Sequence, residues 1–245
     1  MSYNETRAIT YVHSRDRERE MKQLTIAIDG PAGAGKSTVA QIVASRLNYT
    51  YIDTGAMYRA VAWLVVQQDL NVEDTSATGE LAASADIRLC FADGSQQVFV
   101  NGLNVTQEIR SPGVSRLVAD VARQPLVREA LLTMQRQMAQ TGGVVMDGRD
   151  IGTHVLPWAD LKIFLTASIE ERAKRRWLEL KAKGHTIVLE ELQNEIAARD
   201  KTDYEREVAP LIQSADAVLL DTTSLSIDGA VAEILRLCKE RAAIV

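Results

Sequence analysis

The sequence predicts an α/β fold in three layers around a parallel central sheet. Short apolar stretches rich in β-branched residues alternate with longer stretches whose apolar residues have helical spacing. Such alternation favours right-handed crossovers between parallel strands. Hydrophobic residues make up 46% of the chain and charged residues 25%, which is the composition of a globular protein and not of a disordered one.

Size, charge and cysteine content restrict the possible functions. The 245 residues suffice for one domain, or for one domain with an insertion. A net charge of −5 argues against a general nucleic-acid or membrane-surface binder. The longest apolar stretch, residues 60–66, is too short to span a membrane, and the N-terminus lacks the apolar core of a signal peptide. Cys90 and Cys238 form neither a disulfide framework nor a metal cluster, which favours a reducing compartment, and we expect a cytoplasmic protein. From the charge and the short apolar stretches, we expect no membrane or nucleic-acid partner.

The first segment, residues 1–22, differs from the rest of the chain. Its charges alternate from Arg15 to Glu20 and leave no apolar face. Such a segment is typical of a disordered tail or of a solvated helix. We therefore expect an N-terminal extension over residues 1–22, without a role in function, and a single domain over residues 23–245.

A phosphate-binding loop follows the first predicted strand. The strand at 24–29 leads into the pattern G-x-x-x-x-G-K-[ST], and a helix is predicted from 39 to 47. Glycines let backbone amides curve around phosphate oxygens, and the helix N-terminus adds its dipole. Lys36 can reach the β- and γ-phosphates, and the Ser37 hydroxyl can ligate Mg²⁺. A glycine-rich turn without a ligand is the plain alternative. The predicted phosphate-binding residues are Gly30, Pro31, Ala32, Gly33, Ala34, Gly35, Lys36, Ser37 and Thr38.

A second strand, predicted at 49–53, leads into an apolar helix that ends at Val66. Asp53 or Thr54 can cap this helix. Arg59 lies about one and a half turns into the helix, where it can point toward the same crevice as the glycine-rich loop. Its guanidinium would suit a second phosphate, because the two groups match in a bidentate pair. An exposed helix arginine is the alternative.

The remaining strands fall into two groups. Residues 86–105 read as strand, turn, strand, turn, which predicts a β-rich insertion in the α/β chain. Apolar stretches at 144–147, 161–165 and 217–221 predict further strands of the main sheet, and 227–236 a closing helix. The first of these stretches ends in Asp147, at the edge where ligands of doubly wound sheets bind.

Two charged helices are predicted in the second half of the chain. The helix from 170 to about 184 has acidic residues first and basic residues later, in agreement with the helix dipole. Arg172 and Arg176 are four residues apart and share a face. A solvated charged helix is the alternative for this segment.

The next helix, predicted at 189–198, brings three charged residues onto one face if it continues. These are Arg199, Asp203 and Arg206, at spacings of four and three. Two arginines around an aspartate can clamp a sugar hydroxyl and a phosphate. An intrahelical ladder of salt bridges is the alternative.

Five segments together resemble the bacterial cytidylate kinases, a family of nucleoside-monophosphate kinases. The glycine-rich loop and D-T-G-A-M-Y-R at 53–59 are followed by N-V-T-Q-E-I-R at 104–110, D-G-R-D-I-G-T at 147–153 and R-D-K-T-D-Y-E-R at 199–206. The resemblance covers about residues 23–240. It implies a P-loop NTPase fold with a β-rich insertion at about 84–110 that covers the monophosphate and a short helical lid at about 170–187.

The resemblance also implies an activity. ATP would transfer its γ-phosphoryl group to CMP, and to dCMP, with Mg²⁺ as cofactor, in pyrimidine nucleotide metabolism; the expected oligomeric state is a monomer. Catalysis would consist of positioning and charge neutralisation, without a protein nucleophile. Lys36, Arg59 and Arg149 are the implied catalytic residues, and Arg172 and Arg176 would close over the ATP phosphates.

The resemblance implies two sets of contacts, one to Mg²⁺ and one to the acceptor nucleotide CMP. Ser37 would ligate Mg²⁺ directly, and Asp147 would act on it through water. Asp150 would accept a hydrogen bond from the cytosine amino group, and Arg110, with Thr106, would meet the base. The full implied CMP site is Thr54, Arg59, Thr106, Arg110, Arg149, Asp150, Arg199, Asp203 and Arg206.

Two other readings of the sequence remain. One is a different P-loop kinase, acting on UMP, AMP or a metabolite such as shikimate, although the residues after Asp53 and the β-rich insertion argue against the metabolite kinases. The other is a nucleotide-dependent switch. The guanine-specifying pattern N-K-x-D is absent from the sequence, which weakens this reading.

Overall fold

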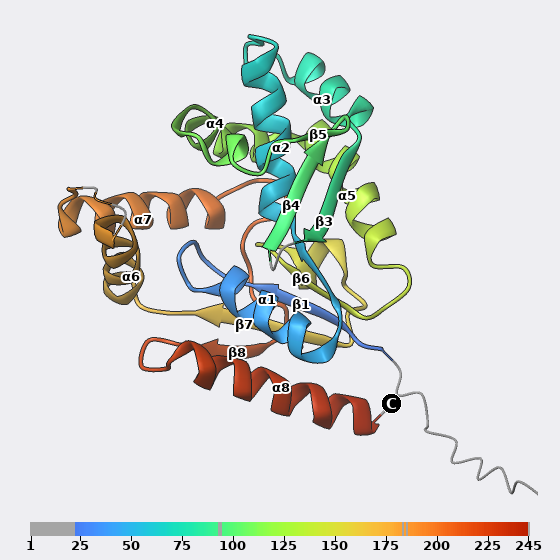
Figure 1. Cartoon of the computed structure of the whole chain (residues 1–245), viewed down its shortest axis with the longest axis vertical. Coiled ribbons are helices and arrows are strands. Elements are labelled where there is room, and N and C mark those ends of the chain that lie inside the picture. The colour runs from blue at the N-terminus through green and yellow to red at the C-terminus, as the bar shows by residue number, and fades with distance from the viewer. Residues whose placement is uncertain (1–22, 93–94, 183, 185, 245) are drawn as a thin grey trace, which may run out of the picture.

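The central sheet has five parallel strands in the order β2-β6-β1-β7-β8 (Figure 1). In this computed structural model, residues 23–92, 95–182, 184 and 186–244 are described, so the expectation for residues 1–22 lies outside the described part. The parallel α/β fold predicted from the sequence is confirmed. The strands are β1 (Thr25–Asp29), β2 (Thr50–Asp53), β6 (Val144–Asp147), β7 (Leu161–Thr166) and β8 (Val218–Asp221).

Both faces of the sheet are covered, which explains why β1 is buried along its whole length. The helices α1 (Lys36–Leu47) and α8 (Ile227–Ile244) pack against one face, with Val39, Val43 and Ile234 in the buried cluster. A single π-helical turn (Ile151–Val155) and the end of helix α5 cover the other face. Because the strands are parallel, β1, β2 and β6 all end at one edge of the sheet.

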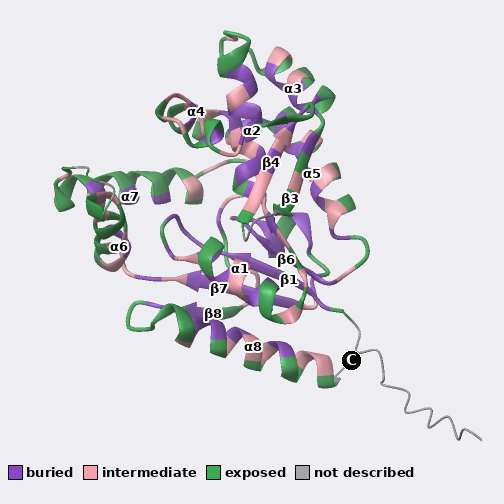
Figure 2. Ribbon diagram, in the orientation of Figure 1, coloured by how far each residue is buried: buried purple, intermediate pink, exposed green. Residues whose placement is uncertain are grey.

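A second hydrophobic core lies above that edge (Figures 1 and 2). The antiparallel sheet β3-β4-β5 falls inside the insertion expected at 84–110, but it is only part of a larger unit, most of which is helical. Buried side chains from α2 to α5, among them Met57, Val61 and Leu131, form this core together with Val98. The unit comprises α2 (Thr54–Gln67), α3 (Thr75–Ser84), β3 (Ile87–Ala92), β4 (Ser95–Val100), β5 (Leu103–Asn104), a 3₁₀ turn (Glu108–Arg110), α4 (Pro112–Arg123) and α5 (Pro125–Met138).

Two helices form an arm beside the sheet. Helices α6 (Ile169–Ala182) and α7 (Leu189–Tyr204) pack on each other through a small core of Ala173, Leu192 and Ile196. Most of the arm is exposed (Figure 2). The helix predicted at 189–198 continues to Tyr204, so it carries Arg199 and Asp203 but ends before Arg206.

None of the helices in the described part of the chain combines the length and the apolar composition needed to cross a membrane.

The structure predicts a large cost for a side chain at Gly30. Its φ of +145° is unfavourable for other residues, and an added Cβ would lie 1.9 Å from the Leu165 carbonyl oxygen in β7. We expect Gly30→Ala to lower the free energy of unfolding by more than about 2 kcal/mol in urea titrations. Gly113→Ala is the matched control, because Gly113 lies in α4 with open space around it; it should be neutral or stabilising. Equal losses in the two variants would contradict this account.

Candidate active site

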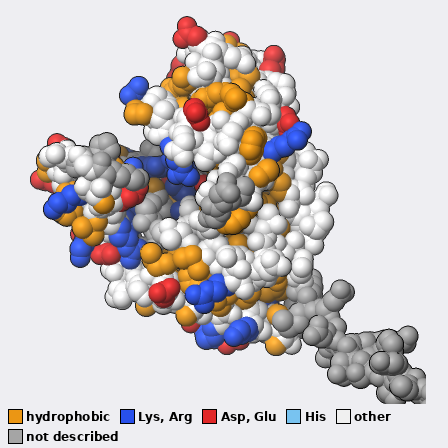
Figure 3. Space-filling model, in the orientation of Figure 1, with side chains coloured by type: hydrophobic (Ala, Val, Ile, Leu, Met, Phe, Trp, Pro, Cys, Tyr) orange, Lys and Arg blue, Asp and Glu red, His pale blue; other side chains and the backbone are white. Residues whose placement is uncertain are grey.

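A cleft of about 1090 Å³ lies between the sheet edge, the upper unit and the arm. Figure 3 shows Lys and Arg side chains gathered in this hollow. Ten basic side chains line the cleft against six acidic ones, an excess of four positive charges in a chain whose net charge is −5. Such a site attracts polyanions. The basic lining residues are Lys36, Arg59, Arg110, Arg128, Arg149, Arg172, Arg175, Arg176, Arg199 and Arg206.

The glycine-rich loop forms one wall of this cleft. It runs from the end of β1 to the first turn of α1, and residues 32–38 line the cleft while Gly30 and Pro31 do not. Lys36 is 5% exposed, and its Nζ donates to the Pro31 carbonyl at 2.8 Å. Burial, together with the positive charge of Arg149, lowers the pKa of Lys36 to about 7. An anion in the loop would therefore stabilise the ammonium form.

A carboxylate and a hydroxyl meet beside the loop. Asp147 ends β6, and the Ser37 hydroxyl donates to its Oδ2 at 3.0 Å. The Tyr51 hydroxyl donates to Oδ1 at 2.8 Å, and burial, with the nearby charge of Asp53, raises the pKa of Asp147 to about 7. Mg²⁺ is usually held by one or two carboxylates together with phosphate oxygens and water. Ser37 and Asp147 therefore fit the metal, although no cluster of three or more His, Cys, Asp or Glu able to hold an ion occurs among the described residues.

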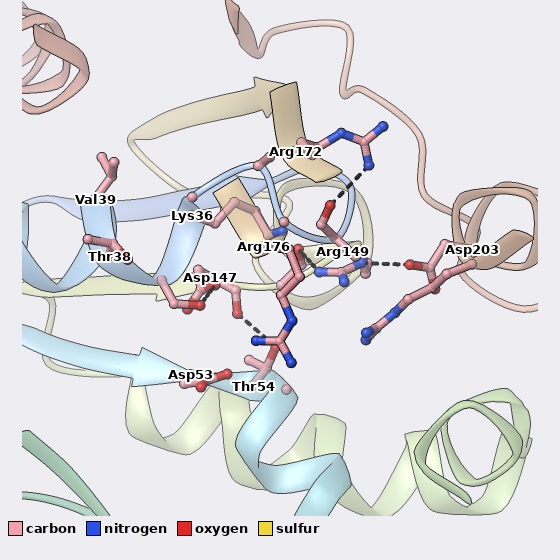
Figure 4. Close-up of a pocket in the computed structure, with 18 of the residues that line it drawn as sticks. Lys36, Thr38, Val39, Asp53, Thr54, Asp147, Arg149, Arg172, Arg176 and Asp203 are labelled. Atoms are coloured by element: carbon pink, nitrogen blue, oxygen red, sulfur yellow. Dashed lines mark hydrogen bonds and ion pairs between the residues drawn. The ribbon is translucent and has the colours of Figure 1, made fainter. Parts of the chain in front are cut away.

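Four arginines that the sequence singled out line the same cleft as the loop. They are Arg59 from α2, Arg149 after β6, Arg199 from α7, and Arg206 just beyond α7. Arg149 Nε donates to Asp203 Oδ2 at 2.8 Å, and Figure 4 shows the pair pointing toward each other. Burial in the cleft, together with the positive charge of Arg149, lowers the pKa of Arg199 to about 10. The side chains are therefore concentrated where a second anion can bind.

Asp150 lines the same cleft and is buried between two arginines. Arg128 Nη2 is 2.5 Å from its Oδ2, and Arg206 Nη2 is 3.8 Å from its Oδ1. Arg128 also lies over the ring of Tyr58, 5.5 Å from its centroid. The Nε atoms of Arg128 and Arg206 are buried without a hydrogen-bond partner in the described structure. These groups form a polar pocket that still has hydrogen-bonding capacity.

Thr106 lies outside the cleft lining. Its hydroxyl donates to Asn104 Oδ1 at 2.6 Å and accepts from the Val98 amide at 3.0 Å, so it closes the turn after β5. Arg110 does line the cleft. The structure therefore does not bring Thr106 together with the other residues predicted to meet the base.

The three arginines of α6 differ in their surroundings. Arg172 is 3% exposed and donates to the Ala32 carbonyl in the glycine-rich loop at 3.0 Å and to both carboxylate oxygens of Asp200 at 3.1 and 2.7 Å. Its guanidinium thus joins the loop to α7, and the ATP contact expected of it stays a prediction. Arg175 Nη2 donates to the Thr222 carbonyl at 2.6 Å, whereas Arg176 is exposed and pairs with Glu179.

Sequence reasoning missed Asp29, the last residue of β1. Its two carboxylate oxygens accept from the amides of Ile151 and Gly152, both at 2.7 Å. Burial raises the pKa of Asp29 to about 6, and the two amide bonds oppose that rise. The carboxylate ties the strand that leads into the glycine-rich loop to the turn that follows Arg149 and Asp150. A charged residue at the end of an otherwise apolar strand is the sequence signal for such a role.

Known proteins resemble this chain over most of its length. The family model for cytidylate kinase matches residues 26–240. The chain belongs to the cytidylate kinase family. It is 53% identical over 220 residues to a cytidylate kinase of Lysinibacillus sphaericus, covering 90% of this chain and 98% of the relative. A cytidylate kinase of an Exiguobacterium species is 55% identical over 219 residues, covering 89% and 98%. The resemblance drawn from the five sequence segments is thus confirmed.

The buried pair between Arg172 and Asp200 predicts a stability effect. Asp200→Asn keeps the shape of the side chain but leaves the Arg172 guanidinium without its carboxylate. We expect the free energy of unfolding to fall by about 3 kcal/mol in urea titrations, because an uncompensated buried charge remains.

The control is Glu233→Gln, which removes an ion pair with Arg236 on the exposed face of α8. Exposed pairs contribute little, so unfolding of this variant should match that of the parent protein. A similar loss in both variants would show that burial does not determine the strength of the Arg172 pair.

Proposed function

We propose that this member of the cytidylate kinase family transfers the γ-phosphoryl group of ATP to CMP, and to dCMP, giving ADP and the corresponding diphosphate. The observation that carries the proposal is the presence of Arg59, Arg149, Arg199 and Arg206 in one cleft with the glycine-rich loop. Phosphoryl transfer requires donor and acceptor to lie in line, with their charges neutralised. We further propose that residues 23–245 act as a single cytoplasmic kinase domain and as a monomer, and that the N-terminal extension over residues 1–22 has no role in catalysis.

On the donor side, the backbone of residues 32–38 and the Lys36 ammonium bind the ATP phosphates. The Ser37 hydroxyl, with Asp147 acting through water, would hold Mg²⁺. The cation would supply positive charge that neutralises the charge developing on the phosphates during transfer. Thr54 Oγ1 donates to the Asp147 carbonyl at 2.8 Å and thereby keeps the start of the acceptor site beside the donor site.

On the acceptor side, the four arginines grip the phosphate of CMP. The ion pair of Arg149 with Asp203 fixes the direction of one guanidinium, and Asp203 remains able to accept from a sugar hydroxyl. The protein supplies no nucleophile, because the acceptor phosphate itself attacks. The segment at about 170–187, which includes nearly all of α6, acts as the lid, and its closure excludes water and so suppresses hydrolysis of ATP.

Base choice is assigned to the pocket around Asp150. The carboxylate accepts from the exocyclic amino group of cytosine, and the Arg128 guanidinium holds the carboxylate in place. Uracil presents a carbonyl oxygen at the same position, which the carboxylate repels. A site built this way rejects a base that leaves buried polar groups unpaired.

A panel of acceptors tests the proposed function. Purified protein is mixed with ATP and Mg²⁺ and with CMP, dCMP, UMP, AMP or shikimate in turn, and the products are separated by ion-exchange chromatography. We expect rapid formation of CDP and dCDP, slower use of UMP, and no product from AMP or shikimate. Efficient phosphorylation of AMP or shikimate, or none of CMP, would refute the proposal.

Asp150→Asn tests the assignment of base choice. The variant retains the shape of the side chain but presents an amide in place of a carboxylate, so we expect the preference for CMP over UMP, measured as a ratio of kcat/KM, to fall at least about tenfold. Asp203→Asn is the matched control, because it changes the sugar and phosphate clamp and should lower both kcat/KM values while leaving their ratio intact. An unchanged ratio in Asp150→Asn would remove the assignment.

The lowered pKa of Lys36 predicts proton uptake on ATP binding. Below pH 7 Lys36 is protonated with or without ATP; above about pH 7 it loses its proton in the free protein, whereas phosphates hold it as the ammonium. Affinity for ATP should therefore fall as pH rises above 7, by up to about tenfold per pH unit.

Calorimetry in two buffers of different ionisation enthalpy, at about pH 8.5 where ATP itself is deprotonated, measures this uptake. Lys36→Arg is the control, since arginine stays charged and should take up no proton. Absence of uptake in the parent protein, or equal uptake in both proteins, would contradict the prediction.

A further inference from the structure

Asp147, the carboxylate proposed to act on the cation through water, has a hydrogen-bond donor that the proposed mechanism does not use. Tyr51 lies in the middle of β2, and its Cα is paired with that of Val145 in β6. Side chains two residues apart along a strand share a face, so Tyr51 and Asp147 lie on the same side of the sheet. That side carries α1, against which the Tyr51 ring packs. The hydroxyl thus reaches Asp147 from beneath the helix and not through the cleft.

The two oxygens of Asp147 are held by separate donors. Tyr51 donates to Oδ1 at 2.8 Å and Ser37 donates to Oδ2 at 3.0 Å. Asp147 itself is 3% exposed, which limits the water available to replace either donor. Without the Tyr51 hydroxyl, the carboxylate loses one of these two hydrogen bonds and can turn more easily about its Cβ–Cγ bond.

The direction of the Ser37 hydroxyl explains why such rotation matters. A hydroxyl that ligates a cation must turn its lone pairs toward the metal and its proton away from it. In this structure the Ser37 proton points to Asp147 Oδ2, so the lone pairs are free for a cation on the cleft side. The orientation of Ser37 therefore depends on Asp147, and that of Asp147 depends on Tyr51.

We propose that Tyr51 is a positioning residue for the divalent cation, which acts through Asp147 to orient Ser37. The inference rests on the proposed function, since it concerns the cation that accompanies the donor nucleotide. Partners that orient metal ligands from a second layer commonly change metal affinity by about 10- to 100-fold when they are removed. Tyr51 makes no contact with substrate in this role.

The chain supplies a matched control in Tyr49. It also packs in the cluster beside α1, and its hydroxyl accepts from the Leu24 amide at 2.9 Å, at the opposite end of β1 from the cleft. Tyr49→Phe and Tyr51→Phe each remove one hydroxyl from the same layer. A general loss of packing or stability would affect both variants, whereas an effect on the cation should be confined to Tyr51→Phe.

The experiment measures ADP binding by calorimetry with and without Mg²⁺. The ratio of the two dissociation constants gives the gain in affinity that the cation provides. In Tyr51→Phe we expect this gain to fall about tenfold, while ADP binding without Mg²⁺ stays within twofold of the parent protein. Tyr49→Phe should retain the full gain. In an Asp147→Asn background, Tyr51→Phe should cause no further loss, because the residue through which it acts is already changed.

Each contrary result overturns the inference. One such result is an Mg²⁺-dependent gain in ADP affinity in Tyr51→Phe that stays within twofold of the parent protein. Another is an equal loss of this gain in Tyr49→Phe. The third is a further loss when Tyr51→Phe is added to Asp147→Asn. Should Tyr51→Phe fail to fold, Tyr51→Leu keeps an apolar side chain beside α1 and provides the same measurement.

Phosphorylation of CMP by the parent protein is assayed in parallel. Its absence refutes the proposed function. A normal rate with an unchanged Mg²⁺-dependent gain in ADP affinity in Tyr51→Phe refutes only this inference.

Discussion

The site depends on holding many positive charges together before any phosphate arrives. Guanidinium groups that lie close together in a partly buried cleft repel one another, and their burial adds a desolvation cost. Three aspartates that are buried or half-buried offset both effects: Asp150 pairs with Arg128, Asp200 with Arg172, and Asp203 with Arg149. These pairs fix the direction of three guanidinium groups, so these side chains need little reorganisation when substrate binds.

The sheet supplies the frame for these pairs. Parallel strands deliver the glycine-rich loop, Asp53 and Asp147 to one edge, and the clamp of Asp29 on the amides of Ile151 and Gly152 fixes the turn that follows Arg149. Arg172 then ties the loop to α7 through Ala32 and Asp200. The glycine-rich loop, the turn after β6 and α7 are thus linked by hydrogen bonds between buried groups, which is the kind of support that precise positioning requires.

Local patterns predicted the parts of this site that are contiguous in sequence. The glycine-rich loop, the strand before it and the segment opening at Asp53 could be predicted because their signals lie within a few residues. The buried partners could not, since Arg128 is 22 residues from Asp150, Arg172 is 28 from Asp200, and only the fold brings them together. Helices α3, α4 and α5 were also missed. For α4 a signal was present, because Ser111 followed by Pro112 is typical of a helix start, and the Ser111 hydroxyl caps that helix.

The central claim is that the acceptor side is built chiefly to grip a phosphate. Calorimetric binding of CMP and of cytidine to the same protein tests it most directly, because the two ligands differ only in that group. The account predicts that CMP binds at least about 100-fold more tightly, which corresponds to about 2.7 kcal/mol. Equal affinities for the nucleotide and the nucleoside would contradict it.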